Sequence, residues 1–300
     1  MKIFGKQVFV ANLKSTFKKV LAGWILVFTG LGLAGLVGDY AVKNWSFEPT
    51  NRLYLQALVM SGIVLPGILF LRKRLDKGTP DTIGFQGLKS NLKSFGLGMG
   101  IIMGPLLVMA LFSDLLGWSD VQINYDSDTT SKLVLGLLTV LFFEALPEEL
   151  LFRGYLYSNL RTSFKKWQAG TITVLLFLLL PITLSLVQKY FFGMEISLSG
   201  ANTITMEYVI MILVFGSFIQ YLRIMTNNVF TGMGFHLFFI GFNRINGNGA
   251  TSLKFIQFND ITNNGAMQIT MLVCVVIIVI GLLVFPYLSL RNAKAEALEA

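Results

Sequence analysis

Long apolar runs separated by short polar segments dominate the pattern along the 300-residue chain. Most of the runs approach the roughly 20 residues that a helix needs to cross a bilayer. They predict eight transmembrane helices, at residues 20–42, 53–71, 95–116, 133–152, 167–190, 208–225, 228–242 and 266–290. The runs are continuous rather than alternating, so a β-barrel is not expected. The predicted fold class is therefore an all-α, polytopic transmembrane helical bundle.

Composition agrees with this pattern. The chain is 54% hydrophobic and only 13% charged, with a mean hydropathy of +0.67. Because a soluble domain carries about 25% charged residues, we expect one integral-membrane domain over residues 1–300. Within it, residues 1–19 are expected to form a surface helix or a basic flank, and residues 291–300 a solvated tail. The single cysteine, Cys274, excludes an intramolecular disulfide.

The basic residues are clustered, and their placement predicts a topology. The formal net charge is +8, and Lys and Arg gather near positions 2–19, 72–93, 161–166, 223 and 291–294, whereas the loops between are poorer in basic residues and carry several acids. The positive-inside rule then places both termini in the cytoplasm, which requires an even number of spans. Because the positive charge does not cover one soluble face, no nucleic-acid partner is expected. We predict a multi-pass protein of a bacterial cell membrane.

The fourth predicted span ends with ionisable residues at membrane depth. Glu148, Glu149 and Arg153 follow an apolar run, and a charge at that depth costs at least about 2.5–3.5 kcal/mol on insertion scales. A position at the water interface would reduce this cost. Glu144 and Pro147, earlier in the same span, nevertheless place several carboxylates on one transmembrane helix. The pattern therefore indicates a functional cluster.

Helical geometry predicts different surroundings for the two adjacent acids. Glu149 and Arg153 are four positions apart and share a helix face, with the glutamate N-terminal to the cation. Glu148 is turned about 100° away and stacks over Glu144. Two nearby carboxylates in a low-dielectric site disfavour double ionisation, so one can accept a proton as a general base must. Pro147 lacks a backbone N–H and predicts a local kink.

The chain contains one histidine, His236, in the seventh predicted span. A lone histidine can be a packed or interfacial residue. In the predicted topology, however, His236 lies about 12 Å from the start of its span, at ~1.5 Å per residue. Glu148 lies near the cytoplasmic end of the fourth span, so both belong to the cytoplasmic half of the bilayer. We expect His236 and the glutamates to line one cavity.

Small residues four positions apart predict close helix packing in two spans. The sets are Gly30, Ala34 and Gly38 in the first span, and Gly96, Gly100 and Gly104 in the third. With Gly98, the second set also resembles a phosphate-binding loop, but its place inside an apolar helix favours packing. Asp126 and Asp128 precede the fourth span, where helix capping explains them more simply than calcium binding.

The segment with the glutamates, the arginine and the histidine resembles a known family of intramembrane endopeptidases. This is the CAAX prenyl protease and bacteriocin-processing (CPBP, or CAAX protease self-immunity) family. The resemblance extends from about residue 79 to His236. Its core is the signature Glu-Glu-x-x-x-Arg-Gly, which is present as Glu148, Glu149, Arg153 and Gly154. The signature lies in a span and follows a glycine-rich helix. The resemblance implies a catalytic chamber that opens towards the cytoplasm.

Two signature positions depart from the family pattern. The family has a phenylalanine followed four residues later by a histidine; here Phe177 is followed by Pro181. It also has an asparagine four residues after the second histidine; here His236 is followed by Ile240. No other histidine in the chain can supply the missing one. The departures predict that water in the site has fewer positioning partners, a loss that typically costs about 10²–10⁴ in rate.

The resemblance implies a role for each matched residue. Glu148 resembles the general base that activates water, and Glu149 with Arg153 looks like the supporting ion pair. His236 resembles the group that stabilises the tetrahedral oxyanion. We expect no cofactor, and a zinc mechanism is disfavoured because one histidine and no cysteine cluster leave too few ligands.

Three functions are compatible with these residues. The first is a glutamate-dependent intramembrane endopeptidase that cleaves membrane-associated peptides or proteins near the cytoplasmic face, with membrane lipid as its surroundings. The second is a catalytically silent member that binds and orients a membrane partner; Pro181 and Ile240 favour it. The third is a transporter that relays protons through Glu144, Glu148 and Glu149, although no inverted repeat is visible. The intact glutamate–arginine signature favours the endopeptidase.

Overall fold

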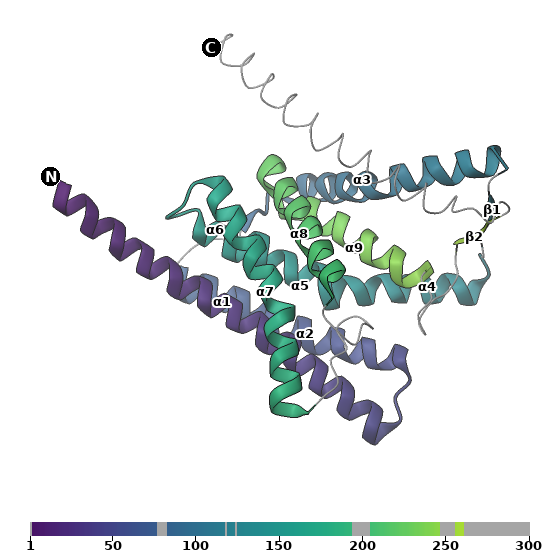
Figure 1. The fold of residues 1–300 in the computed structure, drawn as a ribbon, viewed down its shortest axis with the longest axis horizontal. Helices are drawn as coiled ribbons and strands as arrows, with labels where there is room; N and C mark the ends of the chain where they lie inside the picture. The colour runs from purple at the N-terminus through teal and green to yellow at the C-terminus, as the bar shows by residue number, and fades with distance from the viewer. Residues whose placement is uncertain are drawn as a thin grey trace, which may run out of the picture.

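The computed structural model describes residues 2–76, 83–117, 119–123, 125–193, 205–246 and 256–260. These residues form an almost wholly helical bundle (Figure 1). In chain order the elements are α1 (Lys2–Trp45), α2 (Pro49–Leu71), η1 (Arg72–Asp76), α3 (Leu88–Leu115), β1 (Ser119–Ile123), α4 (Ser127–Val140), η3 (Leu141–Ala145), α5 (Leu146–Glu149), η4 (Leu150–Leu156), α6 (Tyr157–Leu160), α7 (Lys166–Phe192), α8 (Met206–Thr226), α9 (Val229–Asn246) and β2 (Ile256–Asp260). The η elements are π-helical turns.

Five helices of the described segments are long and apolar enough to cross a membrane. They are Asn12–Trp45, Pro49–Asp76, Leu88–Val108, Lys166–Phe192 and Met206–Thr226, and the apolar helix Val229–Phe242 is shorter. The prediction of an all-α, integral, multi-pass membrane protein is therefore confirmed. Residues 133–152 are also helical, but π-helical turns divide them. The predicted span 266–290, with Cys274, lies outside the described residues.

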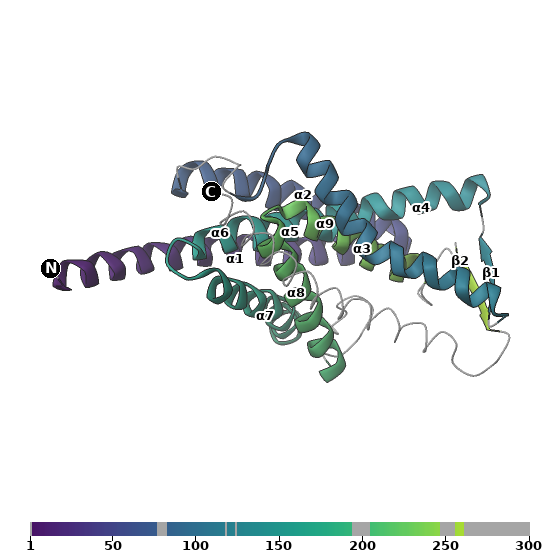
Figure 2. The same ribbon diagram turned by 90° about the horizontal axis from the view of Figure 1, so that it is seen from above.

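The segment that carries the two glutamates forms the centre of the bundle. α1 packs against α2, α3 against α9, and α7 against α8, while η4 contacts α1, α2, α7 and α9. Figure 2 shows α3 and α9 side by side, and α1 reaching beyond the rest of the bundle at its N-terminal end. Ionisable residues on the central segment are therefore surrounded by helices rather than by lipid, which lowers the cost of placing them in a membrane.

The first predicted packing motif is confirmed. Gly30 and Gly38 of α1 face α2, and a Cβ atom built on them would lie 2.6 Å from Val64 and 2.7 Å from Gln56. Ala34, between them, is fully buried. The small residues thus allow the backbones of α1 and α2 to approach closely, as their spacing predicts.

Within the described part of the chain, the glycines of the second predicted motif make no close helix contact. Cβ atoms built on Gly96, Gly100 and Gly104 meet nothing within 4 Å among the described residues. The close contact of α3 with α9 uses Gly98 instead, where a Cβ would collide with the carbonyl oxygen of Thr231. The contacting face of α3 includes Asn91, Phe95, Gly98 and Ile102, and that helical face differs from the one the three other glycines share.

Polar contacts gather the basic segments at one end of the bundle. The buried carboxylate of Asp76 lies 3.2 Å from Lys19 and 2.6 Å from Arg72, and it accepts a hydrogen bond from Asn159 at 3.1 Å. These contacts tie α1, η1 and α6 together. Three segments that are distant in sequence therefore lie close together at Asp76.

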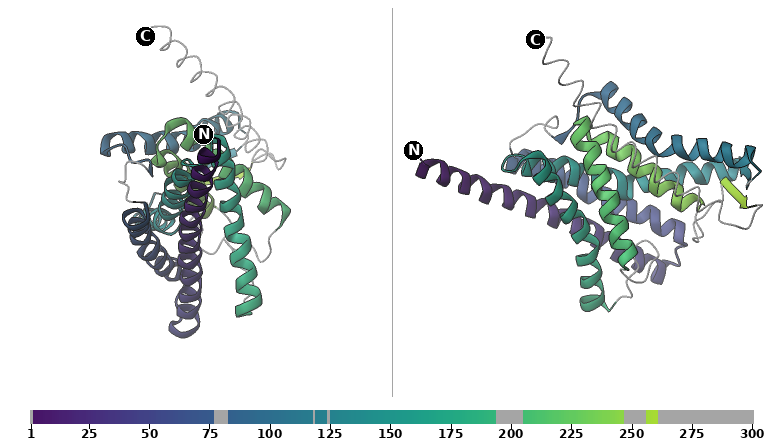
Figure 3. Two further views of the ribbon diagram at one scale, coloured as in Figure 1. Left: turned by 90° about the vertical axis from the view of Figure 1, so that its left-hand side faces the viewer. Right: turned by 45° about the horizontal axis from the view of Figure 1, so that its top comes forward.

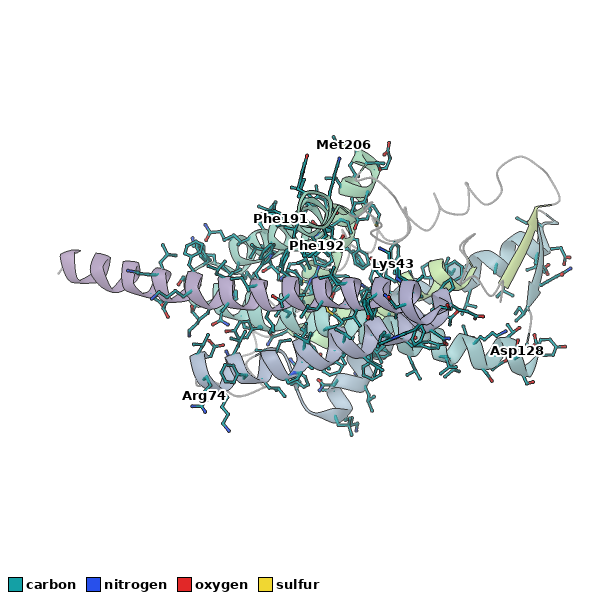
Figure 4. All side chains as sticks on the ribbon, turned by 90° about the horizontal axis from the view of Figure 1, so that it is seen from below. Lys43, Arg74, Asp128, Phe191, Phe192 and Met206 are labelled. Atoms are coloured by element: carbon teal, nitrogen blue, oxygen red, sulfur yellow. The ribbon has the colours of Figure 1, made fainter. Side chains whose placement is uncertain are left out.

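The start of α4 lies at the opposite end. Figure 4 places Arg74 and Asp128 at opposite ends of the molecule. The Asp126 side chain accepts the backbone N–H of Thr129 at 2.9 Å, which confirms the predicted helix cap. The sequence did not predict the nearby two-stranded antiparallel ribbon, in which β1 pairs with β2 from Ser119↔Asp260 to Ile123↔Ile256.

Candidate functional site

Wide helical turns flank the two glutamates. The N–H of Leu146 bonds the carbonyl of Leu141, five residues back, and the N–H of Tyr157 bonds that of Phe152 in the same way. Pro147, which has no N–H, is the second residue of the short α-helical segment between them. The predicted kink takes the form of these π-helical turns, which occur in proteins frequently at functional sites.

Neighbouring helices satisfy carbonyl groups beside these wide turns. The hydroxyl of Ser61 on α2 donates to the carbonyl of Phe142. On the other side, Arg223 of α8 donates from Nε to the carbonyl of Arg153 at 3.0 Å. Such partners make irregular helical backbone tolerable at membrane depth, because a buried carbonyl without one is costly. The wide turns are therefore held in place by two other spans.

Glu149 is the centre of a buried polar cluster. Its Oε1 atom lies 3.1 Å from Nη1 of Arg153 and 2.9 Å from Nδ1 of His236. Glu149 and Arg153 are 0% exposed, and His236 is 2% exposed. Arg153 also donates from Nη2 to the carbonyl of Gly216 at 3.3 Å. The predicted pairing of Glu149 with Arg153 is confirmed, and the histidine that joins the pair comes from α9.

Aromatic rings enclose this cluster. The guanidinium of Arg153 lies over the ring of Phe177, 4.3 Å from its centroid, and 5.9 Å from that of Phe152. Phe215 meets the His236 ring edge-on, with centroids 4.9 Å apart. A cation held against aromatic faces in a dry site is stabilised by more than at a surface. The rings therefore cover the Arg153 guanidinium and pack against the His236 ring.

The second carboxylate oxygen of Glu149, Oε2, faces Gly232, where any larger residue would place a side chain against it. No hydrogen-bond partner of Oε2 exists among the described residues. A Cβ atom built on Gly232 of α9 would lie 2.9 Å from this oxygen and 2.7 Å from Ile219. A buried carboxylate oxygen without a partner is costly, since it has lost its hydration. It is a ready acceptor for a donor that enters the site.

Glu148 differs from Glu149 in its access. It is buried but 9% exposed, and it interacts electrostatically with Arg153. Both Glu148 and Glu144 also interact electrostatically with Tyr208 of α8. Glu148 is therefore the more accessible acid of the adjacent pair. Tyr208 adds a hydroxyl to this region that the sequence did not suggest, because an aromatic residue near a span end is common.

A second buried arginine, Arg223 of α8, contacts the backbone of the site. Besides holding the Arg153 carbonyl, Arg223 donates to Oδ1 of Asn227 at 2.8 Å and lies over the Tyr157 ring. It also lies against Gly84, whose φ of +99° favours glycine. In the sequence, Arg223 was noted only as one of the basic residues that predict the membrane topology. The cost of a charge within an apolar span was the signal that could have singled it out.

The two departures from the family pattern lie one turn beyond site residues. Pro181 follows Phe177 on α7, and its carbonyl accepts the hydroxyl of Ser185 at 2.7 Å. Ile240 follows His236 on α9 and packs against the hydrophobic core. Neither side chain can donate a hydrogen bond. Within the described segments, no group of three or more His, Cys, Asp or Glu side chains could hold a metal ion.

Residues 130–241 match the family model described as Rce1-like: type II CAAX prenyl endopeptidase Rce1-like. The matched segment is therefore similar to the CAAX protease family. It contains Glu148, Glu149, Arg153 and His236, so the CAAX protease match and the buried cluster coincide. No curated protein and no solved structure matches the chain. The match supports CAAX-type intramembrane protease activity.

Proposed function

We propose that the protein is an intramembrane endopeptidase of the CAAX protease type that uses Glu148 as its general base. It would cleave membrane-associated peptides or proteins near the cytoplasmic face, in a bundle of eight spans with both termini in the cytoplasm. The observation that supports this most is the contact of Glu149 with both Arg153 and His236, beside the more accessible Glu148. A protein that only binds a partner has little need for this buried set of charges.

The proposed reaction assigns one task to each group. Glu148 takes a proton from water while the water oxygen attacks the peptide carbonyl carbon, and the carbonyl π electrons move to its oxygen. The Glu149 carboxylate lies against Nδ1 of His236 and orients the imidazole ring. Its Nε2–H then donates to the oxyanion. When the C–N bond breaks, Glu148 returns the proton to the leaving nitrogen.

Glu149 and Arg153 act on this reaction through position and charge. Arg153 holds the Glu149 carboxylate, and that carboxylate holds the His236 ring. A donor that is oriented before reaction stabilises the developing charge without reorganisation, and removing one such donor typically costs about 10²–10³ in rate. The aromatic wall around Arg153 lowers the local dielectric, which strengthens each of these interactions.

A silent scaffold is the second candidate, and Pro181 favours it. This residue stands where the family pattern has a histidine, so a hydrogen-bonding group is missing from α7. A scaffold would keep the helical chamber and bind a membrane partner without cleaving it. The two functions differ in whether the Glu148 carboxylate is needed once folding is intact.

The test is cleavage by purified protein in lipid vesicles. The probes are a fluorogenic prenylated peptide that ends in a Cys-aliphatic-aliphatic-X sequence and the same peptide without the prenyl group. We expect wild type to cleave one of them and Glu148→Gln to lose about 10²–10⁴ in rate at unchanged thermal stability. Glu207→Gln, at an exposed acid on α8, is the matched control and should keep full activity.

A gain-of-function variant separates the two candidates further. Pro181→His restores the histidine of the family pattern and should raise the cleavage rate if the chamber is otherwise complete. Absence of cleavage of both probes by folded wild type and by Pro181→His would overturn the endopeptidase proposal in favour of the scaffold. Full activity in Glu148→Gln would overturn the assignment of the base.

A further inference from the structure

A groove between α1 and α7 lies on the outside of the bundle. It encloses about 290 Å³ and is lined by Phe17, Val20, Leu21 and Trp24 of α1 and by Ile172, Leu176, Leu179 and Thr183 of α7. Figure 3 shows the two helices side by side, and they are in contact. On α7, Leu176 lines the groove, whereas the adjacent Phe177 turns inward to Arg153. The groove is therefore separate from the candidate active site.

The walls of the groove fit a hydrocarbon chain. Seven of its eight lining residues are apolar, and Phe17, Leu21 and Leu179 are half exposed. The indole N–H of Trp24 is already bonded to the carbonyl of Leu176 at 3.0 Å, which leaves Thr183 as the only lining side chain with a polar group to offer. The lining stripe of α7 spans about 17 Å at 1.5 Å per residue, comparable with half the hydrocarbon thickness of a bilayer.

Both walls lead to lysines at the same end of the groove. On α7 the lining positions repeat every three or four residues, and the same face continues from Ile172 back to Lys165. On α1, Lys14 lies two turns before Leu21 on the same flank. Near these two lysines, α1 contacts the segment before α7, because Asn12 donates to the carbonyl of Thr162 at 3.1 Å.

These lysines are available to a ligand. Lys14 and Lys165 are exposed, as are the adjacent cations Lys18 and Lys166. None of the four forms an ion pair with a carboxylate of the described residues, in contrast to Lys19, which lies 3.2 Å from Asp76. An apolar groove that ends in uncompensated positive charge matches a ligand with a hydrocarbon chain and an anionic head. Basic pockets between transmembrane helices are typical binding sites for anionic lipid head groups.

We propose that this groove is a binding site for an anionic phospholipid. One acyl chain lies along the groove between Leu21 and Leu176, and the phosphate lies between Lys14 and Lys165. The lipid would join α1 to α7 at the end where Thr16 also contacts Ser163, at 2.9 Å. This site is independent of the proposed peptidase activity, because none of its residues belongs to the Glu149 cluster.

The test measures lipid binding to the full-length protein in detergent by native mass spectrometry. The probes are phosphatidylglycerol and, as the neutral comparison, phosphatidylcholine with the same acyl chains. We expect wild type to retain phosphatidylglycerol preferentially. Lys14→Gln/Lys165→Gln should weaken that binding roughly 25-fold, because each lysine near an anionic lipid contributes about a fivefold gain in affinity. Lys89→Gln/Lys93→Gln, at two exposed lysines of α3, is the charge-matched control and should leave it unchanged.

A second pair of variants tests the groove itself. Leu179→Trp fills it and should reduce phosphatidylglycerol binding, whereas Leu175→Trp, on the same helix but outside the lining, should not. Inorganic phosphate should not compete at millimolar concentration if the acyl chain contributes to binding. The proposal would be overturned if wild type retained the two lipids equally or if the two lysine double variants lost binding equally. Full displacement of the lipid by phosphate would also overturn it.

Discussion

Nδ1 of His236 lies 2.9 Å from Oε1 of Glu149, although the two residues are 87 positions apart in sequence. The same oxygen lies 3.1 Å from Arg153. One buried carboxylate thus links Arg153, on the central segment, to His236 on α9. The proposed oxyanion donor is therefore oriented by Glu149 rather than by Glu148. In the proposed reaction the two glutamates thus have different tasks, because Glu149 orients His236 and Glu148 transfers the proton.

The Glu149–Arg153 ion pair makes a prediction about stability. Both residues are fully buried, so Glu149→Ala or Arg153→Met leaves one charge without its partner and should lower the free energy of unfolding by about 3–5 kcal/mol. The double variant Glu149→Ala/Arg153→Met removes both charges and should be more stable than either single variant. Thermal unfolding of purified protein in detergent measures this. Additive losses in the double variant would contradict the pairing.

The open space beside Glu149 makes a second prediction. In Gly232→Ala the new Cβ would lie 2.9 Å from Oε2 of Glu149, so either the carboxylate or α9 must move. We expect peptide cleavage to fall by about 10²-fold, because small displacements of catalytic groups are that costly. Gly136→Ala on α4, whose Cβ meets nothing within 4 Å among the described residues, is the control. It should keep activity and gain up to about 1 kcal/mol of stability.

The crossing of α3 and α9 makes a third prediction, which distinguishes two sets of glycines. Gly98→Ala would place its Cβ against the carbonyl oxygen of Thr231, and backbone atoms cannot yield as a flexible side chain can. We expect a loss of at least about 1–3 kcal/mol, the usual range for overpacking. Gly100 lies two positions further along α3, on a different face of the helix. Gly100→Ala should therefore be neutral or stabilising. A larger loss in Gly100→Ala than in Gly98→Ala would show that the third span uses the face of Gly96 and Gly104 instead.

The predicted topology is testable with reporter fusions. Asp126 and Lys165 flank the segment that carries the glutamates, and the positive-inside rule places them on opposite sides of the membrane. Paired fusions at these two positions, one reporter active in the cytoplasm and one active outside it, should give opposite signals. The same signal at both sites would remove the glutamate segment from the set of spans and change the predicted parity of the bundle.

Much of the local structure could be predicted from the sequence, because the responsible interactions are local. Apolar runs of sufficient length predicted the long helices, since unpaired backbone groups are too costly in lipid. The pairing of Glu149 with Arg153 followed from a separation of four positions on a helix, and the cap at Asp126 from the residue type that precedes α4.

The meeting of distant helices could not be predicted in the same way. The face of α3 that contacts α9 depends on the shapes of both helices, so the regular spacing of Gly96 and Gly100 was a poor guide, while Gly98 makes the contact. The capping of the Arg153 carbonyl by Arg223 likewise requires two segments whose approach has no local signature. Such contacts are decided by how side chains of several helices fill one space.

By itself, the sequence determined the class of the protein, the helices, and the acids and arginine that one helix presents together. These follow from hydropathy and from a repeat of 3.6 residues per turn, which are properties of single segments. Only the tertiary structure decided that His236 joins Glu149 and that Gly232 leaves one carboxylate oxygen open. Both depend on the position of α9 against the central segment, and that position results from packing over the whole bundle rather than from any pattern within one helix.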